Sequence, residues 1–381
     1  MRVLISAGEA SGENYGALLL PELRRILGND TEFFGVGGER MRAAGCEIVV
    51  DSKTIAVVGI TEVIKHIPRI YREFFRMVSA ARGRRPDVAV LIDFPDFNLR
   101  LAEKLHGMGV PVVYFVSPQL WAWKKRRIRR VQRYVDRMLV IFPFEESYYR
   151  ERGVKAEYVG HPLADLPLPQ GRREELSRKF GVDISKHWIA LLPGSRQKEV
   201  LLNLPMMLAA AARLGSAYEF LLPVASTLSR DWMKMQVERS STPIHLVDDS
   251  RVALLHARAS IVASGTATVE AALMGNPFVV VYRLSNLSYE IGRRFVKLKN
   301  YAMVNLIAGR EIVPELIQDR FTAENVASEI QKLVPESSER ENMMAELKEV
   351  RERLHLSSST PQETAIKRAA AGIAGVLAAR M

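Results

Sequence analysis

The sequence predicts an α/β protein built from two successive domains, each a doubly wound parallel sheet, with a helical C-terminal tail. Short β-branched runs alternate with longer helical patterns, which is typical of βαβ units. A proline-rich stretch at 161–171 interrupts this alternation once, after which it restarts. A chain of 381 residues, 48% of them hydrophobic, is long and apolar enough for two buried cores.

The individual elements follow from these patterns. In the first half the apolar runs predict strands at 3–6, 33–36, 48–50, 88–92, 112–116, 138–141 and 157–159. Helical patterns lie between them, at 15–27, 62–81, 99–108 and 145–152. In the second half, strands are predicted at 188–192, 219–222, 244–247, 260–263 and 278–282, and the chain is helical from about residue 322. We therefore expect domains at 1–165 and 172–345, and a tail at 346–381 that packs on the first domain or on a partner protomer.

Composition narrows the classes of function. Lysine and arginine exceed aspartate and glutamate by 54 to 43, a formal charge of +11, which favours nucleic acid, an anionic membrane surface or phosphorylated substrates as partners. The single cysteine, Cys46, excludes an intramolecular disulfide framework and a cysteine-cluster metal site. No apolar run has the length of a signal peptide or of a membrane-spanning helix, so we expect a cytoplasmic protein.

Ligands of doubly wound sheets bind beyond the carboxyl ends of strands, so the residues that follow strands are the first candidates. After the first strand, Ser11 and Gly12 lie in a glycine-rich turn that opens a helix, where a backbone can approach a ligand closely. A tight turn that serves only packing explains this turn equally well. Asp93 ends a second apolar strand, where burial makes a carboxylate a better proton acceptor. Its alternative role is to cap the following turn, and Asp96 is expected to cap a helix.

Two turns in the second half have the features of anion sites. Gly194, Ser195 and Arg196 lie between a strand and a helix, where free N–H groups and a guanidinium can bind a phosphate, although surface arginines are common there. Gly265 and Thr266 form a similar turn. Glu270 lies one position beyond the place that a capping box requires, and it could instead accept the hydroxyls of a ribose. Together these turns indicate a nucleoside diphosphate.

Several motifs are absent from the sequence. It contains no Asp-x-Asp, His-Glu-x-x-His, Cys-x-x-Cys or Gly-x-Ser-x-Gly, so we expect no metal, no cofactor and no serine-hydrolase chemistry. Among the histidines only His161 is expected near a ligand, and a structural role is as good an explanation.

Two cation-rich stretches each allow two interpretations. Residues 121–133 combine two tryptophans with seven cations, which suits either nucleic acid or a solvated helix face. Residues 60–78 form an apolar stripe interleaved with basic residues, which either packs on the sheet or lies on a membrane. Ile67, Ile70, Phe74 and Phe75 are the candidate membrane contacts.

Eight motifs in chain order resemble those of the lipid-A-disaccharide synthase family. They are SAGEASGE from Ser6, IDFPDFN from Ile92, YFVSPQLWAW from Tyr114, FPFE from Phe142, Gly160-His161, LPGSR from Leu192, SGTA from Ser264 and NLIAGRE from Asn305. The resemblance covers the chain to about residue 315. It implies a GT-B glycosyltransferase whose two domains face a cleft, the first for the acceptor and the membrane, the second for the UDP-sugar.

The resemblance also implies a reaction, in which 2,3-diacylglucosamine passes from its UDP donor to 2,3-diacylglucosamine 1-phosphate with inversion. Asp93 would be the base and Arg196 would bind the departing diphosphate, while Asn305 would serve the donor site. The inner membrane leaflet then becomes the expected partner instead of nucleic acid, and exchange of the C-terminal segment between protomers leaves a homodimer open. A UDP-sugar epimerase and a basic RNA-binding protein are the alternatives.

Overall fold

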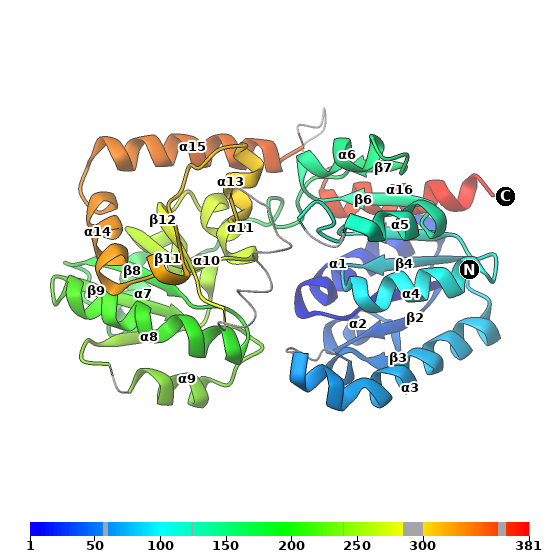
Figure 1. Ribbon diagram of the computed structural model, residues 1–381, viewed down its shortest axis with the longest axis horizontal. Coiled ribbons are helices and arrows are strands. Elements are labelled where there is room, and N and C mark those ends of the chain that lie inside the picture. The colour runs from blue at the N-terminus through cyan, green and yellow to red at the C-terminus, as the bar shows by residue number, and fades with distance from the viewer. Residues whose placement is uncertain (56–59, 123–124, 239, 285–299, 357–362, 381) are drawn as a thin grey trace. The chain divides into compact units, whose positions relative to one another are not determined.

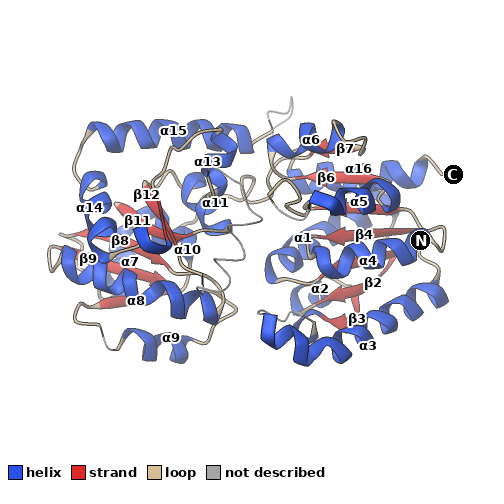
Figure 2. Ribbon diagram, viewed as in Figure 1, coloured by secondary structure: helices blue, strands red, loops and turns tan. Residues whose placement is uncertain are grey.

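The computed structural model describes the chain except residues 56–59, 123–124, 239, 285–299, 357–362 and 381. The described residues divide into two compact units (Figure 1). The first consists of Met1–Asp165 together with Leu354–Met381, and the second of Leu166–Arg353. Each contains one sheet with helices on its faces (Figure 2), so the predicted α/β class is confirmed.

The sheet of the first unit has seven parallel strands in the order β3-β2-β1-β4-β5-β6-β7. Their bounds are β1 (Arg2–Ala7), β2 (Glu32–Gly37), β3 (Glu47–Asp51), β4 (Val88–Ile92), β5 (Val112–Phe115), β6 (Arg137–Val140) and β7 (Ala156–Tyr158). Strand β4 is buried at every position, because helices cover both faces of a parallel sheet and leave no place for alternating polar residues. In register, Val3 of β1 pairs with Phe33 of β2 and Val88 of β4.

The helices of this unit form two layers. They are α1 (Ala10–Leu27), α2 (Glu39–Ala43), α3 (Ile60–Arg84), α4 (Pro95–His106), α5 (Ile128–Tyr134), α6 (Pro143–Arg150) and α16 (Ala365–Ala378), with short 3-10 turns at Ser52–Thr54 and Lys125–Arg127. Side chains of α3, α4 and α5, among them Met77, Leu101 and Val131, join one core cluster with the sheet. The C-terminal helix α16 packs against α1 and contacts β5 and β6 (Figure 1), so the tail folds back on the first unit of its own chain.

The second unit has six parallel strands in the order β10-β9-β8-β11-β12-β13. Their bounds are β8 (His187–Leu192), β9 (Tyr218–Pro223), β10 (Ile244–Val247), β11 (Ala259–Ala263), β12 (Phe278–Tyr282) and β13 (Glu315–Ile317). The helices are α7 (Arg173–Phe180), α8 (Gln197–Leu214), α9 (Arg230–Val237), α10 (Ser250–His256), α11 (Thr266–Leu273), α13 (Met303–Ala308), α14 (Ala323–Leu333) and α15 (Ser338–Leu354), with a 3-10 turn at Gln318–Arg320.

All twelve strands predicted from the sequence are present, each with ends within one residue of the prediction. Strand β13 was missed. It has only three residues, Glu315–Ile317, and it pairs with β12 at the edge of the sheet. So short a run carries too little periodicity to be recognised, and its pairing with β12 depends on the rest of the fold.

Candidate functional site

Each sheet has one point at which the strand order reverses, and the predicted site residues gather there. In the first unit the chain runs outward from β1 through β2 to β3, and then from β4 to β7 on the other side. In the second unit the same reversal separates β8 from β11. Ligands of such sheets bind just beyond the carboxyl ends of the strands at these points. Ser11, Gly12 and Asp93 follow β1 and β4, whereas residues 194–196 and 265–270 follow β8 and β11.

In the first unit, the loops after β1 and β4 are in direct contact. A Cβ atom on Gly8 would lie 2.2 Å from the ring of Phe94, so only glycine fits there. The first turn of α1 follows, with Ser11 half-buried and Gly12 buried, and no side chain caps this turn. The structure therefore brings Ser11 and Gly12 to the same edge of the sheet as Asp93.

Three residues without glycine's freedom adopt left-handed backbone conformations at this edge. Asp93 has φ 47° and Phe94 has φ 49°, both directly after β4. Val116, directly after the neighbouring strand β5, has φ 61°, an unfavourable value for a β-branched side chain. Such strain persists only where the surrounding structure holds it, and it concentrates at functional sites.

The backbone of Asp93 is fixed by three hydrogen bonds. Its N–H donates to the carbonyl of Phe115 at 3.2 Å. Its own carbonyl accepts from the Tyr114 hydroxyl at 2.5 Å and from Nδ2 of Asn98 at 2.8 Å. Asp93 itself is half-buried. Asp96, expected as a helix cap, lies in the first turn of α4 and pairs with Arg127 instead.

A second carboxylate, Glu145, lies in this unit and was not identified from the sequence. Its Oε1 accepts from the Ser117 hydroxyl at 2.7 Å and from the Trp121 indole at 3.1 Å, and its Oε2 accepts from the Phe142 N–H at 3.3 Å. Complete burial, with a smaller contribution from the charge of Asp93, raises the pKa of Glu145 to about 7, although the three hydrogen bonds that it accepts lower it. The only signal in the sequence was its place in the FPFE motif, at the start of the helix after β6.

His161 is buried within the first unit. It is buried against the rings of Tyr15 and Phe142, at centroid distances of 6.4 and 5.3 Å. Its Nδ1 accepts from the Leu163 N–H at 3.2 Å. Burial lowers the pKa of His161 to about 3, so the ring is neutral at physiological pH.

In the second unit, the turn after β8 already holds an anion, the carboxylate of Glu199. Its Oε2 accepts from the Ser195 N–H at 3.1 Å, and its Oε1 lies 2.9 Å from the guanidinium of Arg196. Gly194 has φ 125° and no room for a Cβ beside Glu199. The carboxylate thus occupies the place that a phosphate group would take at the start of α8. Because the Arg196 side chain is exposed, its ion pair with Glu199 is weak and can be exchanged.

The turn after β11 offers a second set of groups. Gly265, with φ 151°, precedes α11, and Thr266 is the first residue of that helix; both are exposed. Glu270, one turn later, accepts from the Ser250 hydroxyl at 2.8 Å. Burial raises the pKa of Glu270. A backbone turn and a carboxylate therefore lie on one helix at this edge.

Asn305, which the family resemblance predicts to serve the donor site, is fully buried, and its amide is hydrogen-bonded within the second unit. Nδ2 donates to the Val313 carbonyl and to Glu315 at 2.9 and 2.8 Å, and Oδ1 accepts from the N–H groups of Ile312 and Val313 at 2.8 and 3.0 Å. These four hydrogen bonds use both donors and both acceptor positions of the amide within the fold.

Helix α3 contains the four candidate membrane contacts, and the structure contradicts one of them, Phe74. Ile67, Tyr71 and Phe75 are exposed and Ile70 is half-buried. Phe74, however, is only 8% exposed and packs on Phe97 at 5.3 Å between ring centroids. It belongs to the core and is not a membrane contact. The side chains of residues 60–66 lie outside the described part of the chain.

The basic stretch that follows Trp121 is only partly described, because Trp123 and Lys124 fall outside the described residues. Trp121 binds Glu145 and Arg127 pairs with Asp96, so two members of the stretch serve the fold. Arg126, Arg129, Arg130 and Arg133 are exposed. No helix within the described residues is both long and apolar enough to cross a membrane.

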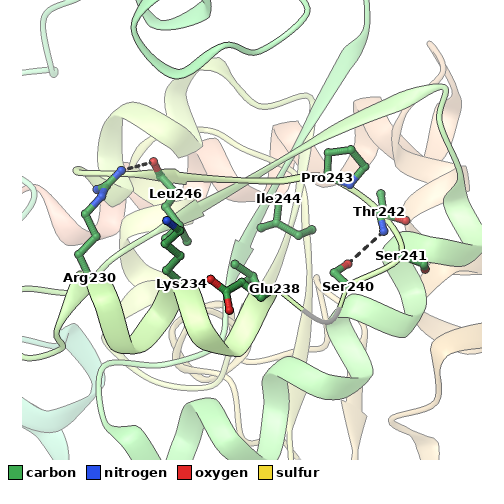
Figure 3. Close-up of a pocket in the computed structure, with 10 residues that line it drawn as sticks. Arg230, Lys234, Glu238, Ser240, Ser241, Thr242, Pro243, Ile244 and Leu246 are labelled. Carbon is green, nitrogen blue, oxygen red and sulfur yellow. Dashed lines mark hydrogen bonds between the residues drawn. The ribbon is translucent and has the colours of Figure 1, made fainter.

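A hollow in the second unit lies away from these residues. It measures about 530 Å³ and is lined by α9 and the edge strand β10 (Figure 3), including Arg230, Lys234 and Ile244. None of the predicted site residues lines it. In the described part of the chain, no three histidine, cysteine or acidic side chains are grouped so as to hold a metal.

Comparison with solved structures identifies the fold. The chain is similar to the calicheamicin glycosyltransferase CalG4, with a TM-score of 0.61 at 16% identity, covering 99% of this chain and 98% of that one. It is also similar to the UDP-GlcNAc 2-epimerase of Methanocaldococcus jannaschii, with a TM-score of 0.63 at 10% identity, covering 98% of this chain and all of the other. Both likenesses concern the GT-B fold alone.

Comparison of sequences identifies the family. The family model of lipid-A-disaccharide synthetase matches residues 3–369. The lipid-A-disaccharide synthases of Koribacter versatilis and Acidobacterium capsulatum are each 55% identical to this chain. The first match covers 99% of this chain and 98% of the relative, and the second covers 96% and 94%. This chain therefore belongs to the lipid-A-disaccharide synthetase family and is a glycosyltransferase of lipid A biosynthesis.

Proposed function

We propose that this enzyme transfers 2,3-diacylglucosamine from UDP-2,3-diacylglucosamine to the 6-hydroxyl of 2,3-diacylglucosamine 1-phosphate, with inversion. The observation that supports this most is the division of chemistry between the two sheets. One reversal point carries a half-buried carboxylate on a strained turn, Asp93, and the other carries an anion-binding turn with an arginine, Arg196. A glycosyl transfer from a nucleotide donor needs both of these functions.

The chemistry assigns a role to each group. Asp93 takes the proton of the acceptor hydroxyl while its oxygen attacks the anomeric carbon, and the bond from that carbon to the diphosphate breaks on the opposite face. The negative charge that develops on the departing UDP is stabilised by Arg196 and the first N–H groups of α8, after the diphosphate replaces Glu199.

The remaining predicted residues are proposed to hold the donor. Gly194 and Ser195 supply backbone groups to the diphosphate, and Gly265 and Thr266 do so from the second turn. Glu270 accepts the ribose hydroxyls, while Ser11 and Gly12 approach the donor from the first unit. Asn305 acts only indirectly, through the fold around α13.

Product analysis tests this function directly. Incubation with both acylated substrates should give a diacylglucosamine disaccharide 1-phosphate and one UDP per disaccharide, identified by mass. A UDP-sugar epimerase shares the GT-B fold, so the donor alone provides the control. Epimer formed without acceptor, and no disaccharide with it, would contradict the proposal.

Substitutions of Asp93 and Arg196 should change different quantities, the first kcat and the second the Kd of UDP. Asp93→Asn keeps the shape but cannot accept a proton, so kcat should fall by about 10²- to 10⁴-fold while the Kd of UDP is unchanged. Arg196→Ala should weaken UDP binding by about 10-fold or more, because a charge-assisted hydrogen bond is lost. Arg213→Ala, which removes an exposed arginine at the far end of α8, is the matched control. Unchanged turnover in Asp93→Asn would rule out the base assignment.

The buried Glu145 should make stability depend on pH. Its pKa is about 7 in the folded chain and near 4.5 when exposed, so folding retains a proton that the unfolded chain releases. Its contribution is therefore complete below pH about 4.5 and is lost as the pH rises through about 7, at about 1.4 kcal/mol per pH unit between them.

The Glu145→Gln variant lacks this titration. Its free energy of unfolding, relative to that of the natural chain, should therefore increase from about pH 5 to about pH 7.5. Urea unfolding at both pH values measures it. Glu151→Gln removes an exposed carboxylate from the end of the same helix and serves as control. A difference between variant and natural chain that does not change with pH would show that Glu145 is ionised throughout.

We further propose that the enzyme works on the cytoplasmic leaflet of the inner membrane, docked through α3. Ile67, Tyr71 and Phe75 are exposed and spaced four residues apart, so they lie on one face of the helix. Exposed Arg69, Arg72 and Arg76 flank them and suit anionic headgroups. Docking of this kind gives the enzyme access to acylated donor and acceptor in the lipid layer. A homodimer stays a prediction of the family resemblance.

Two adjacent phenylalanines test the docking surface. Phe75→Ser should reduce binding to phosphatidylglycerol-containing vesicles in a flotation assay and leave Tm unchanged, because this side chain is 56% exposed. Phe74→Ser should lower the stability by about 3 kcal/mol or more, because it removes a buried ring. Equal vesicle binding by Phe75→Ser and the natural chain would exclude this helix as the docking surface.

A further inference from the structure

A fully buried serine–asparagine pair ties the ends of β1 and β4 together. The Ser6 hydroxyl donates to Oδ1 of Asn98 at 2.6 Å, and both residues are 0% exposed. Nδ2 of Asn98 lies within hydrogen-bond distance of three carbonyl groups: Asp93 at 2.8 Å, Ile92 at 3.2 Å and Ser6 at 3.3 Å. One amide thus joins both strands of the reversal point to the first turn of α4.

These contacts act on the strained turn itself. The peptide of Asp93 leaves β4 in a left-handed conformation that an aspartate adopts only at a cost in free energy. The shortest of the contacts that Nδ2 of Asn98 makes is to the carbonyl of this residue. A buried donor that is lost leaves buried carbonyls without a partner, which costs far more than the same loss at the surface.

We propose that Asn98, oriented by Ser6, is a positioning residue for Asp93. It fixes the backbone from which the Asp93 carboxylate projects, so that the carboxylate stands ready to take the proton of the acceptor hydroxyl. This inference rests on the proposed role of Asp93 as base, and it assigns the Ser6–Asn98 pair a function beyond the stability of the fold.

The second unit contains a matched pair that has only the structural role. The Ser260 hydroxyl donates to Oδ1 of Asn276 at 2.6 Å. Nδ2 of Asn276 donates to the carbonyls of Leu254 and Ala257 at 2.9 and 2.7 Å. This pair lies at the amino ends of β11 and β12, on the edge opposite the proposed site. It has the same chemistry and burial, without a catalytic group nearby.

The test compares Asn98→Asp with Asn276→Asp. Each variant keeps the size of the side chain, keeps an acceptor for its serine and loses the amide donor. Both should lower Tm. Only Asn98→Asp should lower kcat, by about 10²-fold, the cost of a small displacement of a reacting group, while its Kd for UDP stays unchanged. Equal kcat in the two variants, below their melting temperatures, would overturn the proposal.

Two further variants keep the test decisive if Asn98→Asp does not fold. Ser6→Ala and Ser260→Ala each remove one hydroxyl and leave the asparagine in place. Ser6→Ala should lower kcat more than Ser260→Ala at equal loss of Tm, and equal kcat values would overturn the proposal.

A double variant separates this inference from the function on which it rests. In an Asp93→Asn background, Asn98→Asp should cause no further fall in kcat, because the group that it positions is already absent. A further fall of the same size as in the natural chain would show that Asn98 acts independently of Asp93. Full turnover in Asp93→Asn alone would instead refute the base assignment.

Discussion

The parallel direction of every strand is the constraint on which the rest of this molecule depends. Parallel strands all end at the same edge, so the loops and helix N-termini that follow them must gather there. The strand order reverses between β1 and β4 in the first unit and between β8 and β11 in the second. Within each unit, the predicted site residues that follow these strands therefore lie at one edge of its sheet.

The two edges are built in different ways, and the difference matches the chemistry proposed for each. The edge of the first unit is strained and internally bonded. Asp93 and Val116 adopt left-handed conformations there, and buried amide, phenol and carboxylate groups hold the turns. A proton acceptor must be held in one geometry, and rigid surroundings provide this. The edge of the second unit is exposed, and its anion-binding turn holds Glu199 through contacts that a diphosphate can replace. In the proposed reaction, Glu199 can return to this turn when UDP leaves, so the exchange favours release of the product.

Burial also decides the charge state of two ionisable groups in the first unit. Glu145 and His161 are both buried, and burial moves their pKa values in opposite directions because it disfavours the charged form of each. The histidine is thereby kept neutral and packs between aromatic rings. The glutamate is brought to a pKa near physiological pH beside Asp93, so a change of its charge would be felt at the proposed base.

The sequence by itself determined twelve of the thirteen described strands, their order along the chain and the turns that follow them. These depend on local periodicity and on residues, such as Gly194 and Gly265, whose backbone freedom is needed wherever they stand. It also placed Asp93 and Arg196 at strand ends.

Only the tertiary structure decided which side chains remain available to a ligand. Phe74 and Phe75 are identical in type and adjacent, yet Phe97 of another helix buries the first and leaves the second exposed. Asn305 is saturated by groups that follow it on a loop and on β13, and Glu145 is buried by a loop that precedes it by more than twenty residues. Burial and bonding capacity depend on partners that are distant along the chain, and no local pattern contains them.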